Sequence, residues 1–196
     1  KVIQTIGLGQ RARGIAVSPD GSRVYVALSD DVPMRESSGD RIAVIDAATA
    51  KVVSRYRSGS DPEQFGVTPD GRSVWAGNRA EDTISIIDTK SLEVVKRIQS
   101  PGFPYRVQFT PDGKFALIPH ANASALVVAD VAKQEIVKSI PLGLTKIDKP
   151  STAGVFPHPD NRHAFVTVRN DNSMLVLDLV SGGRVVHRAG DAAEIG

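Results

Sequence analysis

A short motif recurs four times along the chain and constrains the fold more than any other feature. Its copies are "IAVSPDGSRVYVALS", "FGVTPDGRSVWAGNR", "VQFTPDGKFALIPHA" and, less regular, "VFPHPDNRHAFVTVR". The prolines of these turns, spaced by 50, 42 and 48 residues, are Pro19, Pro69, Pro111 and Pro159. A period near 42 residues is typical of repeat proteins, in which each unit packs mainly against its neighbours. We therefore expect four structural units.

A second marker supports the same division, because an aspartate closes an apolar run in every unit. The last three of these aspartates follow their prolines by 19 residues, whereas Asp46 follows Pro19 by 27. The first unit therefore carries an eight-residue insertion, which must lie in "SDDVPMRESSGD". The four aspartates are Asp46, Asp88, Asp130 and Asp178.

Each unit reads as four short strands. In the second unit the runs "QFGVT", "SVWAG", "TISIID" and "EVVKRI" are rich in β-formers and are separated by turn residues. The "PDG" is itself a turn signal, because proline presets φ, aspartate bonds to the local backbone and glycine accepts positive φ. No stretch has helical periodicity. The pattern predicts an all-β fold, a β-propeller made of four-stranded antiparallel blades.

The runs "IAVSPDGSRVYVA", "TISIID" and "EVVKRI" resemble the YVTN-type repeat of surface-layer-like and quinoprotein-associated β-propellers. The resemblance covers nearly the whole chain, and it implies a ring of about seven blades and export to the periplasm or the cell surface. A role as a non-catalytic binding scaffold is favoured for a different reason, because the repeats explain most residues and no reactive cluster is evident. Residues 1–6 match the outer strand of a preceding blade, and residues 190–196 match the start of a following one. We expect four full blades, at approximately 11–58, 61–99, 103–140 and 151–189.

Four blades with a partial blade at each end would leave apolar faces and strand edges uncovered. The chain is therefore predicted to be either a portion of a larger ring, a fragment with about four of its blades, or half of an assembly completed by another chain, such as a second copy in a homo-oligomer. A self-contained ring of four blades would need the first and last blades to close against each other, and the partial blades at the two ends do not favour this.

Composition excludes several kinds of site. The absence of cysteine excludes disulfides, thiolate metal sites and a cysteine nucleophile. The net charge of +2 is too small to argue by itself for a nucleic-acid partner. No apolar run approaches the roughly 20 residues of a membrane helix. No standard catalytic motif occurs. This weakens the case for an enzyme without closing it, because propeller enzymes often assemble a site from one side chain per blade. No residue demands a cofactor or a metal, and we predict no catalytic residue, no cofactor and no metal.

Binding residues are expected on the loops that do not repeat. In a propeller these loops share one face, opposite the "PDG" turns, and loops on a rigid scaffold commonly bind ligands. Guanidinium groups there can hold a carboxylate or phosphate, and an acidic insertion and the "TKIDKPS" insertion fall on the same face. The predicted rim comprises Arg11, Arg13, Arg79, Tyr105, Arg106, His120, Lys149 and Arg169.

Other interpretations stay open. The rim cations have local acidic neighbours, so they can instead form ordinary surface ion pairs. A protein partner or small anionic ligand is favoured, an enzyme using His120 is the first alternative, and single-stranded nucleic acid stacking on Phe103 and Tyr105 is the second. His158 and His163 flank the last turn, where distorted turn chemistry is preferred to a metal site. Trp75 is interpreted as a core residue.

Overall fold

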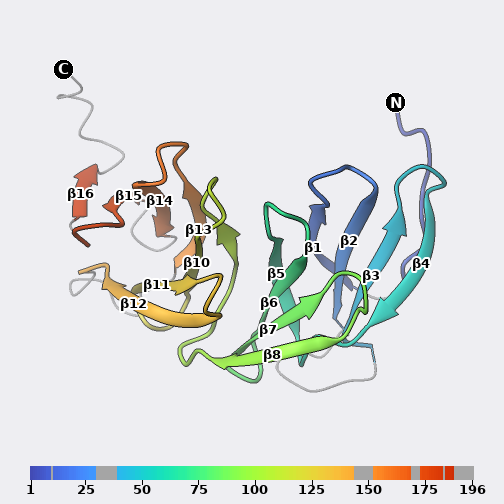
Figure 1. Ribbon diagram of the computed structural model, residues 1–196, viewed down its shortest axis with the longest axis horizontal. Coiled ribbons are helices and arrows are strands. Elements are labelled where there is room, and N and C mark those ends of the chain that lie inside the picture. Colours follow the sequence, from blue (N-terminus) through green and yellow to red (C-terminus); the bar gives the residue numbers. More distant parts are fainter. Residues whose placement is uncertain (10, 30–38, 144–151, 169–172, 183, 188–196) are drawn as a thin grey trace. The chain divides into compact units, whose positions relative to one another are not determined.

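The computed structural model describes residues 1–9, 11–29, 39–143, 152–168, 173–182 and 184–187. These residues form sixteen strands and no helix, which confirms the all-β class. The strands make four antiparallel sheets of four, each in sequential order (Figure 1). No described segment forms a helix able to cross a membrane.

The first sheet contains β1 (Arg11–Val17), β2 (Arg23–Ser29), β3 (Arg41–Asp46) and β4 (Lys51–Tyr56). The second contains β5 (Pro62–Val67), β6 (Ser73–Asn78), β7 (Thr83–Asp88) and β8 (Val94–Gln99). The third contains β9 (Gln108–Phe109), β10 (Phe115–His120), β11 (Ala125–Asp130) and β12 (Glu135–Pro141). The fourth contains β13 (Thr152–Pro157), β14 (His163–Val168), β15 (Ser173–Asp178) and β16 (Arg184–His187). We refer to these sheets as blades one to four.

Burial explains why these runs form strands. The two middle strands of blades one to three are buried along most of their length, as in "TISIID" of β7. Such strands are covered on both faces and read as nearly continuous apolar runs. Outer strands such as β4 and β8 instead alternate exposed and half-buried residues, because only one of their faces meets the core.

The chain divides into two compact units, Lys1–Gln99 and Ser100–Gly196. In the first unit, Tyr25 and Ile42 of blade one share an apolar core with Phe65 and Val74 of blade two. In the second, Leu117 and Leu126 of blade three share a core with residues of blade four such as Val166. Each unit is thus a pair of blades packed face to face.

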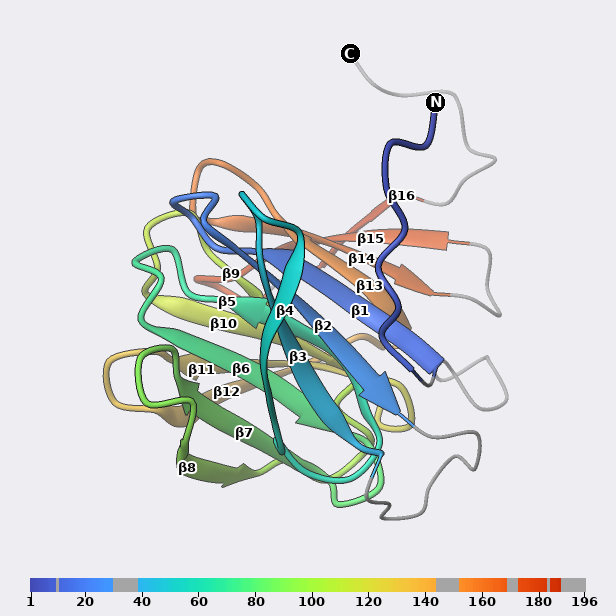
Figure 2. The ribbon, with the colours of Figure 1, turned by 90° about the vertical axis from the view of Figure 1, so that its right-hand side faces the viewer.

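The N-terminal segment has no strand partner. Residues 1–9 form no strand, although residues 1–6 resemble an outer strand, because a strand needs a hydrogen-bonded neighbour. Ile6 and Leu8 instead pack on the apolar cluster formed by Val26, Leu28, Ala43 and Ile45 of blade one. Figure 2 shows this segment, in dark blue, running beside the first blade. It covers part of that apolar surface of the blade.

The aspartates of the repeats stabilise the turns. In the first turn, the Asp20 carboxylate accepts hydrogen bonds from the Ser18 hydroxyl at 2.6 Å and the Ser22 amide at 3.0 Å, which lower its pKa to about 2. Amide bonds from Ser91 and Lys90 lower the pKa of Asp88. A bond from the Thr49 amide lowers that of Asp46. The aspartate of the "PDG" turn and the aspartate that closes an apolar run therefore both have a structural role.

These shifts predict a loss of stability in acid. A carboxyl group whose pKa is lower in the folded chain contributes stability above its unfolded pKa, about 3.9, and loses it as the pH falls toward the folded value. The urea midpoint should therefore fall steeply from about pH 4 to pH 2. A variant with Asp20→Asn, Asp46→Asn and Asp88→Asn should show a shallower fall. A wild-type midpoint that stays constant over this range would contradict the prediction.

Candidate functional site

Four predicted rim residues lie at the loop end of their blades, the end where the second strand leads to the third. Arg11 and Arg13 lie on β1, and Arg79 directly follows β6. Two carboxylates lie against them: Glu63 of β5 and Asp61, the residue before β5. Arg11 contacts Asp61, Arg13 contacts Glu63, and Arg79 contacts both. We call these five residues the arginine–carboxylate cluster. The fourth rim residue, Arg106, belongs to the second unit.

The cluster is built around Glu63. Its side chain is 1% exposed. Oε2 accepts a hydrogen bond from Arg13 Nε at 2.8 Å. Oε1 accepts one from Arg13 Nη2 and a second, at 3.0 Å, from Arg79 Nη1. Arg13 therefore binds Glu63 through the two nitrogens of one guanidinium edge in a bidentate pair, the geometry that makes such pairs strong. Arg11 Nη2 lies 3.6 Å from Asp61 Oδ1 and also donates to Ser29 Oγ at 3.1 Å.

Shifts in the strand pairing of β1 and of β5 set the direction of the side chains of Arg13 and Glu63. The pairing of β1 with β2 shifts between Ala12 and Ile15, and that of β5 with β6 shifts between Pro62 and Phe65. Arg13 and Glu63 lie inside these two segments. A bulge changes the direction of the side chains it contains, so the equivalent irregularities of neighbouring blades bring the two groups together.

Charge in this region is balanced. The side chain of Asp40, which is 1% exposed, accepts a hydrogen bond from the Asp61 amide at 3.0 Å and adds a third carboxylate. Three arginines and three carboxylates give 3 − 3 = 0. The arginine side chains keep only about a quarter of their surface in contact with water. Local ion pairing, the alternative left open by the sequence, therefore accounts for these three cations.

Arg106 differs from the other predicted cations. It has no hydrogen bond or ion pair in the described part of the chain, and its Nε is buried without a partner. Arg106 as a whole residue is half-buried. A buried donor without an acceptor is costly, by about 1–3 kcal/mol. Among the rim cations that the structure describes, Arg106 is therefore the one best prepared to donate hydrogen bonds to an anionic oxygen.

The segment before Arg106 is held rigidly. Backbone hydrogen bonds join Tyr105 to Pro119, at 3.2 Å, and Phe103 to Ala121, at 3.0 Å. The rings of Phe103 and Tyr105 are nearly parallel, with centroids 6.3 Å apart and planes inclined by 11°. Gly102 adopts φ +105°, and a Cβ there would lie 2.7 Å from the Ala123 side chain. The segment thus presents Tyr105 and Arg106 from a fixed backbone.

His120 is a buried residue of blade three. It is 0% exposed, its Nε2 lies 2.7 Å from the Ser100 hydroxyl, and its Nδ1 lies 3.1 Å from the Ile118 carbonyl. Both ring nitrogens are therefore engaged inside the protein, and neither faces a solvent-accessible rim. The remaining rim predictions, Lys149 and Arg169, lie outside the described residues, as do the insertion residues 30–38 and 144–151.

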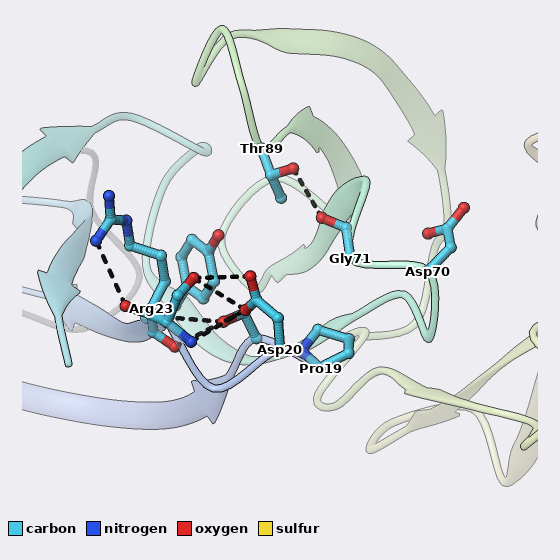
Figure 3. A pocket seen from close by; sticks show the side chains of 9 residues that line it. Pro19, Asp20, Arg23, Asp70, Gly71 and Thr89 are labelled. Carbon is cyan, nitrogen blue, oxygen red and sulfur yellow. Dashed lines mark hydrogen bonds between the residues drawn. The ribbon is translucent and has the colours of Figure 1, made fainter. Parts of the chain in front are cut away.

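A cavity of about 270 Å³ lies at the opposite end of the first unit, among the turns of blades one and two. Figure 3 shows its lining, which includes Pro19, Asp20, Arg23, Asp70, Gly71 and Thr89. Polar groups of its lining already have partners: Thr89 Oγ1 donates to the Gly71 carbonyl at 2.7 Å, and Arg23 pairs with Asp46. We regard the cavity as a gap between satisfied turns rather than as a prepared ligand site.

Comparison with known proteins identifies the family. A model of YNCE-like β-propellers matches residues 24–156, which is 133 of the 196 residues. The chain belongs to the YNCE-like β-propeller family. The propeller fold predicted from the repeats is thereby confirmed. No curated protein matches the sequence.

Solved structures of other propellers resemble this YNCE-like chain. Kuenenia stuttgartiensis hydrazine synthase matches with a TM-score of 0.74 and 25% identity, over 96% of this chain and 53% of that one. The β-propeller domain of Myceliophteria thermophila Cps50 (Swd1) matches with a TM-score of 0.73 and 12% identity, over 92% and 55%. A functionally unknown protein from Desulfotomaculum acetoxidans matches with 0.72 and 14%, over 92% and 56%. The YNCE-like chain spans about half the length of these structures.

The sequence left ion pairing of the rim cations open as an alternative but did not say which residue pairs with which, although the repeats contain the signal. Arg11 and Asp61 each lie eight residues before the turn proline of their blade, and Arg13 and Glu63 each lie six residues before it. Equivalent positions in neighbouring blades of a propeller lie close together. Opposite charges at equivalent positions therefore predict ion pairs between blades one and two.

Proposed function

We propose that this YNCE-like propeller is a non-catalytic binding scaffold whose loop end in the second unit binds an anionic ligand at Arg106. The observation that carries the proposal is the buried Nε of Arg106, which has no partner among the described residues. The ligand class is a carboxylate or phosphate, carried by a small molecule or by an acidic segment of a protein partner. Both offer the oxygens that guanidinium groups bind.

The fold supports a binding role. A β-propeller is a rigid scaffold, and its variable loops can differ without disturbing the blades. The backbone of residues 102–105 is fixed by hydrogen bonds to the end of β10, so little conformational entropy is lost when a ligand contacts Tyr105 or Arg106. A preorganised site binds more tightly for the same contacts.

Phosphate binding tests the proposal directly. Inorganic phosphate should bind the wild type saturably in calorimetry, at constant ionic strength maintained with chloride. Arg106→Ala should weaken binding at least about ten-fold, because hydrogen bonds to charged groups contribute roughly 1.5–3 kcal/mol. Arg106→Lys keeps the charge but loses the planar Nε donor, so its affinity should lie between the two.

The matched control is Arg72→Ala, which removes an arginine whose side chain is 84% exposed at the turn end. Its phosphate affinity should equal that of the wild type. Equal affinity of Arg106→Ala and the wild type, or no saturable binding by the wild type, would overturn the proposed site. Acetate in place of phosphate shows whether a carboxylate is bound equally well.

A small anion is favoured over nucleic acid because Arg11, Arg13 and Arg79 are neutralised by carboxylates. A polyanion would need several uncompensated cations, and its binding would fall steeply with salt. Binding of an oligothymidylate with that salt dependence would instead favour the nucleic-acid alternative. The resemblance to hydrazine synthase, an enzyme by its name, is the reason to assay turnover of bound ligands.

We also propose that the protein is exported, as the YVTN-type resemblance implies. The lack of cysteine is compatible with an oxidising compartment. Fractionation of cells that express the full-length gene tests this proposal: the protein should appear in the periplasmic or surface fraction. Retention in the cytoplasmic fraction would refute export without affecting the proposed anion site.

A further inference from the structure

The turn of blade four differs chemically from the other three. In blades one to three the residue before the turn proline carries a hydroxyl that donates to the turn aspartate at 2.6–2.7 Å. In blade four His158 occupies this position, and His163 lies where the next strand begins. Since three turns close with a hydroxyl, a pair of imidazoles is not needed to close the fourth.

The two oxygens of Asp160 have separate roles. Oδ1 accepts the backbone amides of Arg162 at 2.8 Å and His163 at 2.9 Å, and so maintains the turn. Oδ2 lies 2.6 Å from His163 Nδ1 and 3.1 Å from His158 Nδ1. One ligand atom from each of the three side chains lies within 4.8 Å of the others. The turn therefore fixes a carboxylate oxygen between two imidazole rings.

Ring contacts hold the imidazole of His158 in place, and both imidazoles are partly exposed to water. The His158 ring makes edge contacts with Phe165, at 6.0 Å between centroids, and with His163, at 6.3 Å. The Asp160 amide, 3.2 Å away, donates to the lone pair of His158 Nδ1, so a metal ion bound to this nitrogen would replace that hydrogen bond. The three side chains are 45%, 37% and 35% exposed, so water can reach the space between them.

We propose that His158, Asp160 and His163 form a binding site for a divalent transition metal of the Zn²⁺ or Cu²⁺ type, with water completing its coordination. Two imidazole nitrogens and one carboxylate oxygen are a ligand set that zinc uses, with bonds of about 2.0–2.2 Å. Tetrahedral bonds of that length place ligand atoms roughly 3.3 Å apart. The 3.1 Å between His158 Nδ1 and Asp160 Oδ2 is close to this spacing, whereas the 2.6 Å between His163 Nδ1 and Asp160 Oδ2 has to lengthen when a metal ion binds.

The ligand set also predicts selectivity. Imidazole suits zinc, copper and nickel, whereas Ca²⁺ and Mg²⁺ prefer sites made only of oxygen. Neither hard ion should therefore compete at similar concentrations. The site lies at the turn end of blade four, whereas Arg106 precedes the strands of blade three at the loop end, so the two proposals can fail independently.

The test uses the protein without an affinity tag, titrated with ZnCl₂ in a calorimeter. The test variant combines His158→Thr with His163→Ser. It places in the fourth turn the residue types that the second turn has at the same positions, Thr68 and Ser73. We expect one bound zinc ion in the wild type and an affinity at least about ten-fold lower in the variant. Asp160→Asn keeps the Oδ1 acceptor of the turn and should also weaken binding.

A second readout identifies the ligands. The electron paramagnetic resonance spectrum of bound Cu²⁺ should show nitrogen coupling in the wild type and lose it in the double variant. His187→Gln, which changes a histidine elsewhere in the sequence, should leave zinc affinity unchanged. Equal zinc affinity in the wild type and the double variant, absence of saturable binding by the wild type, or equal affinity for Ca²⁺ would overturn the proposal. Circular dichroism checks that every variant is folded.

Discussion

Phe65→Ala should destabilise the first unit by about 3–5 kcal/mol, the usual cost of removing a buried aromatic ring. Phe65 is 4% exposed and belongs to the core shared by blades one and two. Its Cδ1 would lie 3.3 Å from a Cβ built on Gly14 of β1, so the ring fills space directly beside the neighbouring blade. Truncation therefore opens a cavity that neither blade can close alone.

Fluorescence of Trp75, the only tryptophan, measures this effect because it lies in the first unit. Urea unfolding followed at this residue gives the change in free energy. Val53→Ala is the control, since Val53 lies on β4 and is 54% exposed, and its change should stay within about 0.5 kcal/mol. A loss below about 1 kcal/mol for Phe65→Ala would show that the two blades repack or do not share a core.

Glu63→Gln should destabilise the same unit by about 3 kcal/mol. Removing one partner of a buried ion pair typically costs 3–5 kcal/mol, because the remaining charge is left uncompensated. The lower end applies here, since Arg13 and Arg79 keep 27% and 25% of their side-chain surface in water. Glutamine has nearly the same shape but supplies only one acceptor oxygen, so the bidentate bond with Arg13 is lost.

Glu93→Gln is the matched control, because Glu93 is exposed in the same unit and its replacement should change stability little. A double-mutant cycle with Arg13→Met and Glu63→Met separates the pair from its surroundings. The double variant should be less destabilised than the sum of the single variants. Additive losses would mean that the contact between Arg13 and Glu63 contributes no coupling energy.

The repeats predicted the fold well because the information for it is local. A turn such as that around Asp20 is defined by proline, aspartate and glycine within a few residues, and the apolar runs of β3 and β7 identify strands covered on both faces. Every blade repeats this information. The all-β class and the four-stranded sheets therefore followed from the sequence.

The candidate site was predicted less well, because a charged loop residue looks the same in sequence whether or not it has a partner. Arg13 and Arg106 both precede a "PDG" turn. Packing places Glu63 against Arg13, whereas Arg106 receives no acceptor among the described residues. His120 shows the same limit: its position at a strand end suggested exposure, but contacts with Ser100 and Ile118 keep it inside.

The sequence by itself determined the repeat, the strands and the turns, since each depends on residues adjacent in the chain. Tertiary structure alone decided which charges are neutralised and which histidine is buried, whereas the proximity of His158 and His163 to Asp160 follows from their places in one turn. These outcomes depend on distances of a few ångströms, across strands and between neighbouring blades. Coulomb and hydrogen-bond energies change steeply over such distances, whereas the repeat pattern tolerates either result.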